Sequence, residues 1–141
     1  MIRRLTIDDY EDIVGLWDRA DLPYKPEGRD SKLSIASEMK ENPDFFIGAY
    51  AGNRLIGTVI ASWDLRKGWI NRLAVDPTSR RKGVAETLIA EAEKVLKKRG
   101  SRITCALIED YNSGSMKLFR KCGYLEDRDI VYFSKRESNK V

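Results

Sequence analysis

The feature that most constrains the fold is a strand–loop–helix junction at the run RRKGVA, Arg80–Ala85. Before the loop, residues 68–75 (GWINRLAV) have the apolar and β-branched composition of a strand. After it, apolar side chains recur through residues 84–99 on one helical face, and Gly100 follows as a C-cap glycine. A helix that begins at such a loop leaves backbone N–H groups unpaired at its positive end. The junction is therefore suited to bind a phosphate.

The residue types at this junction also favour an anion. Arg80, Arg81 and Lys82 carry positive charge that a diphosphate would neutralise. Gly83 lets the backbone approach a ligand without a Cβ, and the small Ala85 keeps the first turn open. The alternative is a solvated basic turn that only joins two elements, and spacing alone leaves both open. ATPase and Rossmann dinucleotide functions lack their GxxxxGK[ST] and GxGxxG fingerprints here.

Periodicity places the remaining elements and predicts an α/β (α+β) architecture with an antiparallel meander in the middle. No repeat or low-complexity run divides the chain, so we expect one domain over residues 1–141, ending in a polar tail from Lys135 that frays. The expected elements are a strand at 1–5, a helix with the apolar stripe 10–20, a loop at 21–32, a helix at 33–40, strands at 45–50, 54–63 and 68–75, a helix at 84–99, a strand at 102–108, a helix capped by Asn112 or Ser113, and a closing strand pair at 124–133.

Composition excludes several classes of function. The 141 residues are 42% hydrophobic and include no run near the ~20 apolar residues that a membrane span requires, so we expect a cytoplasmic protein. The chain has no histidine, and its two cysteines, Cys105 and Cys122, lack CxxC spacing. We therefore expect no metal site and no histidine-based catalysis. The net charge of +4 favours anionic partners, but no nucleic-acid recognition pattern accompanies it.

Two runs resemble the signatures of the GNAT family of N-acetyltransferases. Residues 80–85 are similar to Gln/Arg-x-x-Gly-x-Gly/Ala, and the preceding LAVDPTSR is similar to Leu-x-Val-x-Pro-x-x-Arg. The run NSGSMKLFRKCGY, residues 112–124, resembles Asn-x-x-Ala-x-x-Leu-Tyr-x-Lys-x-Gly-Phe. The element order matches the family from Met1 to about Phe133. Within the family, residues 15–22 and the run IEDYN resemble the YpeA-like subgroup of small bacterial and archaeal enzymes.

The resemblance implies a GNAT fold, with a mixed central sheet of six to seven strands, about four helices, and a splay between strands 4 and 5. It also implies acetyl-CoA in that cleft. The backbone at 73–75 would pair with the pantetheine arm, and the amides at 81–86 would hold the pyrophosphate. Asn112 would hydrogen-bond the cofactor near its pantetheine or the chain around it, and Ser115 and Phe119 would line the wall near the thioester. The implied cofactor-binding residues are Leu73, Ala74, Val75, Arg80, Arg81, Lys82, Gly83, Val84, Ala85, Glu86, Asn112, Ser115 and Phe119.

The implied activity is direct transfer of an acetyl group from acetyl-CoA to a primary amine in a ternary complex, without a metal. In many relatives the general acid is the tyrosine of the Leu-Tyr pair, but this chain has Phe119, and a phenyl ring cannot donate a proton. Tyr111 and Tyr124 are the candidates to replace it. The alternative is that no general acid is needed, because coenzyme A thiolate is an adequate leaving group. The backbone N–H of Leu73 is a candidate donor to the oxyanion.

The general base has several candidates. Relatives that use a glutamate carry it where this chain has Trp69 or Leu107. We therefore expect Glu109, acting through a water, to serve as the base, with Asp110 and Asp64 as alternatives. Each of these carboxylates is also consistent with an ordinary solvated loop residue.

The acceptor is left open as a small amine, an amino acid or a protein amine. Its expected site combines the loop 21–32 with Trp63, Trp69, Asn71 and Tyr132, and the two tryptophans fit an aromatic wall or the core equally. Because the chain lacks the usual tyrosine, a non-catalytic acyl-CoA-binding or regulatory module is the alternative function. Many family members dimerise through their terminal strands, so a homodimer is a further expectation.

Overall fold

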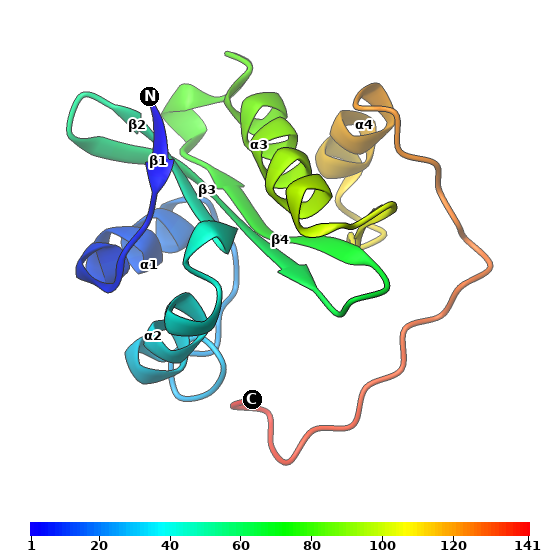
Figure 1. Ribbon diagram of the computed structural model, residues 1–141, viewed down its shortest axis with the longest axis horizontal. Coiled ribbons are helices and arrows are strands. Elements are labelled where there is room, and N and C mark those ends of the chain that lie inside the picture. The colour runs from blue at the N-terminus through cyan, green and yellow to red at the C-terminus, as the bar shows by residue number, and fades with distance from the viewer.

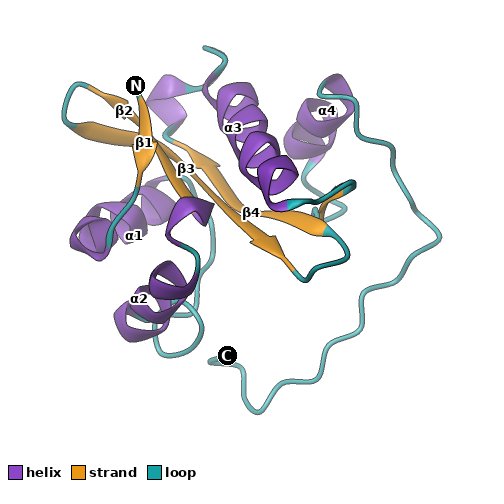
Figure 2. Cartoon of the chain, in the orientation of Figure 1, coloured by secondary structure: helices purple, strands orange, loops and turns teal.

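The computed structural model describes all residues from 1 to 141, and its central layer is a five-stranded sheet. Helices α1 and α2 cover one face of the sheet, and α3 and α4 cover the other (Figure 1, Figure 2). No helix is both long and apolar enough to cross a bilayer. The elements are β1 (Ile2–Arg4), α1 (Tyr10–Arg19), α2 (Lys32–Glu41), β2 (Phe46–Ala51), β3 (Arg54–Trp63), β4 (Gly68–Val75), α3 (Val84–Arg99), β5 (Thr104–Ala106) and α4 (Ser113–Lys121), with short 3-10 turns at Ile7–Asp9, Pro43–Phe45 and Pro77–Ser79.

The strand–loop–helix junction lies where the sequence predicts it. Strand β4 and helix α3 have the predicted bounds, and Gly100 ends α3 in the left-handed conformation at φ 113°. Two glycines allow α3 to approach the sheet closely. A Cβ at Gly68 would lie 2.9 Å from a Leu96 methyl, and a Cβ at Gly57 would lie 2.8 Å from a Leu88 methyl. The sequence therefore positions α3, and with it the loop before α3, against the middle of the sheet.

The sheet pairing leaves one stretch of β4 without a neighbour. Strands β1 to β4 pair antiparallel in chain order, whereas β5 pairs parallel with β4 over only three residue pairs, the last being Ile70 with Ala106. Strand β5 is shorter than the predicted 102–108. The β5-facing edge of β4 is consequently unpaired over residues 71–75.

A bulge interrupts β4 at the start of this unpaired stretch. The register passes from Ile60 opposite Asn71 to Thr58 opposite Ala74. Two residues of β4, Arg72 and Leu73, therefore face one residue of β3, and Arg72 has a φ of 52°. Such a bulge re-aims side chains and disrupts the regular ladder.

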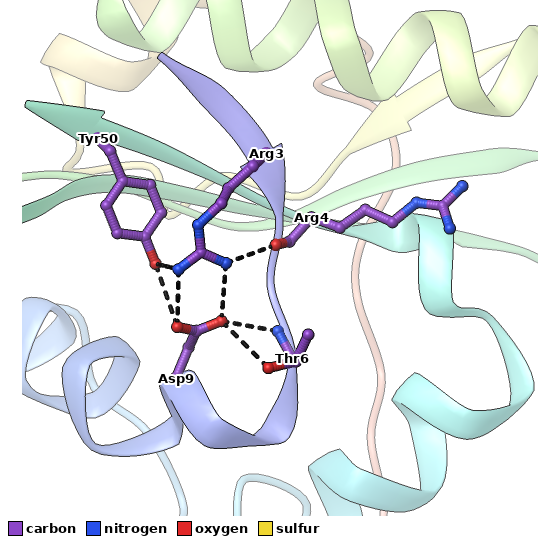
Figure 3. Close-up of polar contacts among 5 residues, drawn as sticks. All are labelled: Arg3, Arg4, Thr6, Asp9 and Tyr50. Atoms are coloured by element: carbon purple, nitrogen blue, oxygen red, sulfur yellow. Dashed lines mark hydrogen bonds and ion pairs between the residues drawn. The ribbon is translucent and has the colours of Figure 1, made fainter. Parts of the chain in front are cut away.

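A polar cluster fixes the N-terminal strand to the start of α1 (Figure 3). Both guanidinium nitrogens of Arg3 donate to the Asp9 carboxylate, at 2.9 and 3.1 Å, and the Thr6 amide donates to it at 2.8 Å. The Arg3 guanidinium also lies 4.2 Å above the Tyr50 ring. The Arg3 hydrogen bond, aided by the Thr6 amide, holds the pKa of Asp9 below its ordinary value although burial acts to raise it. The cluster joins β1, β2 and α1.

The closing strands predicted at 124–133 are not formed, so the prediction of six to seven strands is wrong and the sheet has five. The segment contains the apolar run IVYF at residues 130–133, but Leu125, Ile130, Val131, Tyr132 and Phe133 are all exposed. A strand needs a paired edge as well as a pattern, and this segment runs away from β5 (Figure 1). The polar tail does not end free, because Lys25 Nζ donates to the Asn139 carbonyl at 2.7 Å.

Replacing Asp9 by Asn should lower the free energy of unfolding by about 1–3 kcal/mol at pH 7, because charge-assisted hydrogen bonds from Arg3 are lost. The folded-state pKa of Asp9 is depressed, so its stabilisation is present above the ordinary aspartate pKa of about 3.9 and is lost as the pH falls through the lower folded value. The difference between the two proteins should therefore shrink in acid.

Urea unfolding at several pH values measures this difference, with Asp8→Asn as the control. Asp8 is an exposed acid of the same turn with no side-chain hydrogen bond, and its replacement should change stability by less than about 0.5 kcal/mol. Equal losses in the two variants would show that the cluster does not stabilise the fold.

Candidate active site

Six consecutive backbone amides at the start of α3 have no acceptor within the protein. None of the N–H groups from Arg81 to Glu86 donates a hydrogen bond, and the first amide to do so is that of Thr87, to the Gly83 carbonyl at 3.1 Å. These groups lie at the positive end of a 16-residue helix. This is the backbone geometry that the predicted anion site requires, and the binding itself stays a prediction.

The loop before α3 has a backbone that exposes these amides. Arg81 and Gly83 are both left-handed, at φ 63° and 80°, and a Cβ on Gly83 would contact nothing within 4 Å. The open space in front of Gly83 is therefore free for a ligand. Arg80, Arg81 and Lys82 are exposed and form no ion pair; the only contact of the Arg80 side chain is a 3.3 Å hydrogen bond to the Val75 carbonyl.

A buried carboxylate, Asp76, anchors this loop to the rest of the fold. It accepts hydrogen bonds from the Thr78 hydroxyl and amide at 2.7 and 3.0 Å, from Arg19 of α1 at 3.0 Å, and from Arg54 of the β2–β3 hairpin at 2.9 Å. The Thr78 bonds, followed by the two arginines, hold the pKa of Asp76 well below its ordinary value against the effect of burial. Asp76 therefore stays ionised and fixes the turn at Pro77–Ser79.

The structure brings the predicted β4 and loop residues together at this junction. Leu73 is half-buried, while Ala74 and Val75 are buried, so their side chains belong to the core. Their backbones lie in the stretch of β4 that β5 leaves unpaired. The open edge at 73–75 thus leads directly, through the turn at 77–79, to the free amides at 81–86.

Helix α4 carries the remaining predicted cofactor residues. The Asn112 side chain accepts a hydrogen bond from the Ser115 amide at 3.1 Å, which makes it the N-cap of α4. Phe119 is buried and packs edge-on against the Tyr124 ring, with centroids 5.0 Å apart. An ion pair of 3.5 Å between Glu86 and Lys121 joins the start of α3 to α4. These contacts serve the fold and leave any contact with a cofactor as a prediction.

The predicted catalytic residues lie between β5 and α4. Glu109 and Tyr111 are exposed, and neither side chain has a hydrogen-bond partner. Tyr124, by contrast, donates its hydroxyl proton to Glu93 at 2.6 Å, and burial followed by this bond raises its pKa. Asp64 accepts from the Arg66 and Lys67 amides at 2.9 and 2.7 Å. Tyr124 and Asp64 therefore have structural partners, whereas Glu109 and Tyr111 are free to meet a substrate.

The two tryptophans expected to form one acceptor wall lie on opposite faces of the sheet. Trp63 pairs with Gly68 and lies against Gly100 at the end of α3. Trp69 is the next residue along β4, and strand alternation turns it to the α1 and α2 face. The aromatic wall is therefore excluded, although the loop 21–31 does lie on the same face as Trp69 (Figure 1).

Sequence inspection missed two charged residues near the site, Asp76 and Arg72. Asp76 precedes a proline directly after a strand, and this Asp-Pro pair signals a turn that the aspartate can cap. Arg72 is the one charged residue in the run INRLAV, and a charged residue is unusual in a central strand. The bulge that redirects Arg72 has no signature in the sequence.

Comparison with known proteins supports the family suggested by these residues. The model of the acetyltransferase (GNAT) family matches residues 4–124. An acetyltransferase of Photorhabdus laumondii subsp. laumondii is 34% identical over 137 residues, which cover 96% of this chain and 94% of that protein. The comparisons assign no subgroup, so the likeness to the YpeA-like enzymes stays a prediction.

Solved structures share the fold. The PaiA N-acetyltransferase of Thermoplasma acidophilum in complex with coenzyme A superposes with a TM-score of 0.76 at 25% identity, covering 86% of this chain and 87% of that one. The aminoglycoside acetyltransferase AAC(6′)-Iy with a bisubstrate analogue gives a TM-score of 0.78 at 22% identity, covering 96% and 97%. The second likeness concerns the fold alone.

Replacing Gly83 by Glu should abolish the thermal stabilisation that acetyl-CoA gives to the native protein. At about 100 Kd a ligand adds about 2.7 kcal/mol, which raises the midpoint by several degrees. A glutamate in front of the free amides blocks the approach of the pyrophosphate and adds negative charge there. Thermal denaturation with and without acetyl-CoA measures the effect.

The matched control is Gly52→Glu. Gly52 is also left-handed, at φ 61°, with no atom near its missing Cβ, but it lies in the β2–β3 turn. Both variants should lose about 1–2 kcal/mol to the left-handed backbone, while only Gly52→Glu keeps the ligand-induced shift. A shift retained by Gly83→Glu would contradict the assignment of the anion site.

Proposed function

Because this chain belongs to the acetyltransferase (GNAT) family, we propose that it moves an acetyl group from acetyl-CoA directly to a primary amine in a ternary complex. Acetyl-CoA-dependent acyltransfer follows from the family. The observation that carries the proposal is that two stretches of backbone lack partners: the β5-facing edge of β4 at 71–75 and the six amides at 81–86. A ligand with an amide-containing arm and a pyrophosphate matches these two stretches in order.

The proposed placement of acetyl-CoA follows from these groups. The pyrophosphate accepts hydrogen bonds from the amides of residues 81–86, and Arg80, Arg81 and Lys82 neutralise its charge. The pantetheine arm pairs with the backbone of residues 73–75, where the two central strands splay apart. Asn112 hydrogen-bonds the cofactor near its pantetheine or the chain around it, and Ser115 and Phe119 line the wall near the thioester. The end of the β4–β5 pairing at Ile70 supports the splay.

The chemistry needs three groups from the protein. The amine nitrogen attacks the thioester carbonyl carbon, and the N–H of Leu73, on the bulge, donates to the oxyanion that forms. Collapse of this intermediate breaks the C–S bond and releases coenzyme A as a thiolate. The proton lost by the amine passes to Glu109 through a water, and Tyr111 supplies a proton to the thiolate.

The choice of Tyr111 over Tyr124 rests on hydrogen bonding. Tyr124 is held by Glu93 and is half-buried, whereas Tyr111 is 79% exposed and has no side-chain partner. Glu109 and Tyr111 also come from the segment directly after β5, which parallel pairing directs toward the same edge of the sheet as the open end of β4. This shared direction supports the proposal that Glu109 and Tyr111 meet a substrate near the bulge.

The buried Phe119 in place of a tyrosine favours a second candidate, a module that binds acyl-CoA without turning it over. Release of free thiol on addition of amines separates the two functions, because a binding module gives only the thermal shift. We expect the reaction to take place in the cytoplasm, and a homodimer remains a prediction.

Replacing Glu109 by Gln should lower kcat/KM about tenfold or more while the affinity for acetyl-CoA is unchanged, because the amide cannot accept the proton. Thiol release measured against pH tests this, because the fall in rate at low pH that we expect for the wild type should be absent from the variant. Asp127→Asn removes another exposed carboxylate that has no partner and should have no effect. An unchanged pH–rate profile in Glu109→Gln would remove Glu109 from the mechanism.

A further inference from the structure

Arg72 is half-buried, and two of its three guanidinium nitrogens are buried without a partner. Its Nη1 donates to the Pro23 carbonyl at 2.7 Å, and its Cζ lies 4.1 Å above the Trp17 ring. Its Nε and Nη2 are buried and have no hydrogen-bond partner. Only three side-chain nitrogen or oxygen atoms in the chain are buried in this way, and two of them belong to Arg72. Such atoms call for a partner, because an unpaired buried charge is costly.

The two unpaired nitrogens lie on one edge of the guanidinium. The Nε–H and one Nη2–H point in the same direction, and this fork matches the two oxygens of a carboxylate. Asp30, a buried acid near enough to act on Arg72 through its charge, does not fill it, because no hydrogen bond joins the two; one of its carboxylate oxygens accepts instead from the Lys25 amide at 2.8 Å. Burial lowers the pKa of Arg72, but an arginine stays protonated in proteins.

The bulge in β4 places this fork next to the reacting centre. Arg72 precedes Leu73, and its left-handed backbone is held by a chain of hydrogen bonds in which Trp17 donates to Thr58 and Thr58 donates to the Arg72 carbonyl, each at 3.1 Å. The side chain extends over Trp17 to the α1 face. The anion site of α3 lies at the other face, so the two substrates would approach from different sides.

We propose that the Nε–Nη2 edge of Arg72 binds the carboxylate of the acceptor, which makes the acceptor an amino acid or another small amine that carries a carboxylate close to its amine. This inference rests on the proposed acetyl transfer. The loop 21–31 is tied over Arg72 through the Pro23 carbonyl, and it moves aside for the acceptor to enter. Binding then replaces two unpaired donors by two charge-assisted hydrogen bonds.

The test compares glycine and the L-amino acids that have a primary amine with their carboxamides, which lack the negative charge that Arg72 would bind, at a pH where the amines of both are largely neutral. At least one acid should be acetylated with a kcat/KM about tenfold or more above that of its amide. In Arg72→Gln this ratio should fall toward one, mainly through KM for the acid. Arg72→Lys, which keeps the charge without the fork, should recover only part of it.

Binding without turnover gives a second readout, because a carboxylate at Arg72 changes the surroundings of the stacked Trp17. The preferred acid, and not its amide, should alter tryptophan fluorescence in the presence of coenzyme A. Arg66→Gln is the control, since Arg66 is an exposed arginine of the β3–β4 turn whose side chain has no partner. Each variant is first checked for its unfolding midpoint and for the acetyl-CoA shift.

The outcomes separate this inference from the proposed function. Equal use of acids and amides, or an acid preference that survives in Arg72→Gln, would overturn the role of Arg72 and leave acetyl transfer standing. A loss of stability in Arg72→Gln with an unchanged ratio of acid to amide kcat/KM would show that Arg72 only holds the loop 21–31 through the Pro23 carbonyl. Acids that bind but release no thiol would support the carboxylate site and contradict the transferase activity, whereas no binding by any acid would overturn the site.

Discussion

The buried carboxylate of Asp76 is the interaction on which the active-site geometry depends. It joins α1 through Arg19, the β2–β3 hairpin through Arg54, and the turn before α3 through Thr78. These are the three parts of the chain that must hold the loop at 80–83 in its open form. Because four hydrogen bonds surround this carboxylate, it stays charged in a site that is 1% exposed. The Asp76 network thus holds the turn before α3 without forming a hydrogen bond to any of the free amides at 81–86.

The bulge in β4 gives the two faces of the sheet different chemistry. Beyond the bulge, the edge of β4 is unpaired and continues to the amides of α3. At the bulge, Arg72 turns its side chain to the opposite face, over Trp17 and beneath the loop 21–31. In the proposed function, the edge that β5 leaves open would receive the cofactor, and the bulge would place a cation beside the position at which an acceptor reacts. This arrangement suits a reaction in which both substrates are bound at once.

Local patterns predicted most of the fold, because β4 and α3 carry their signals within a few residues: strand composition, a helical stripe and flanking glycines. The closing strands at 124–133 were mispredicted, since a run of apolar residues says nothing about which sheet edge will pair with it. In the site, the loop at 80–85 was predictable from charge and glycine. Arg72 and Asp76 were not, because their roles arise from a bulge and from arginines that lie far away in the sequence.

The most direct test of the account is amide hydrogen exchange followed by NMR with and without excess acetyl-CoA. The account predicts that the cofactor slows exchange at residues 81–86, which have no acceptor in the free protein, and at the unpaired backbone of residues 73–75. Protection confined to other parts of the chain, with unchanged exchange at the start of α3, would contradict the placement of the cofactor and the function built on it.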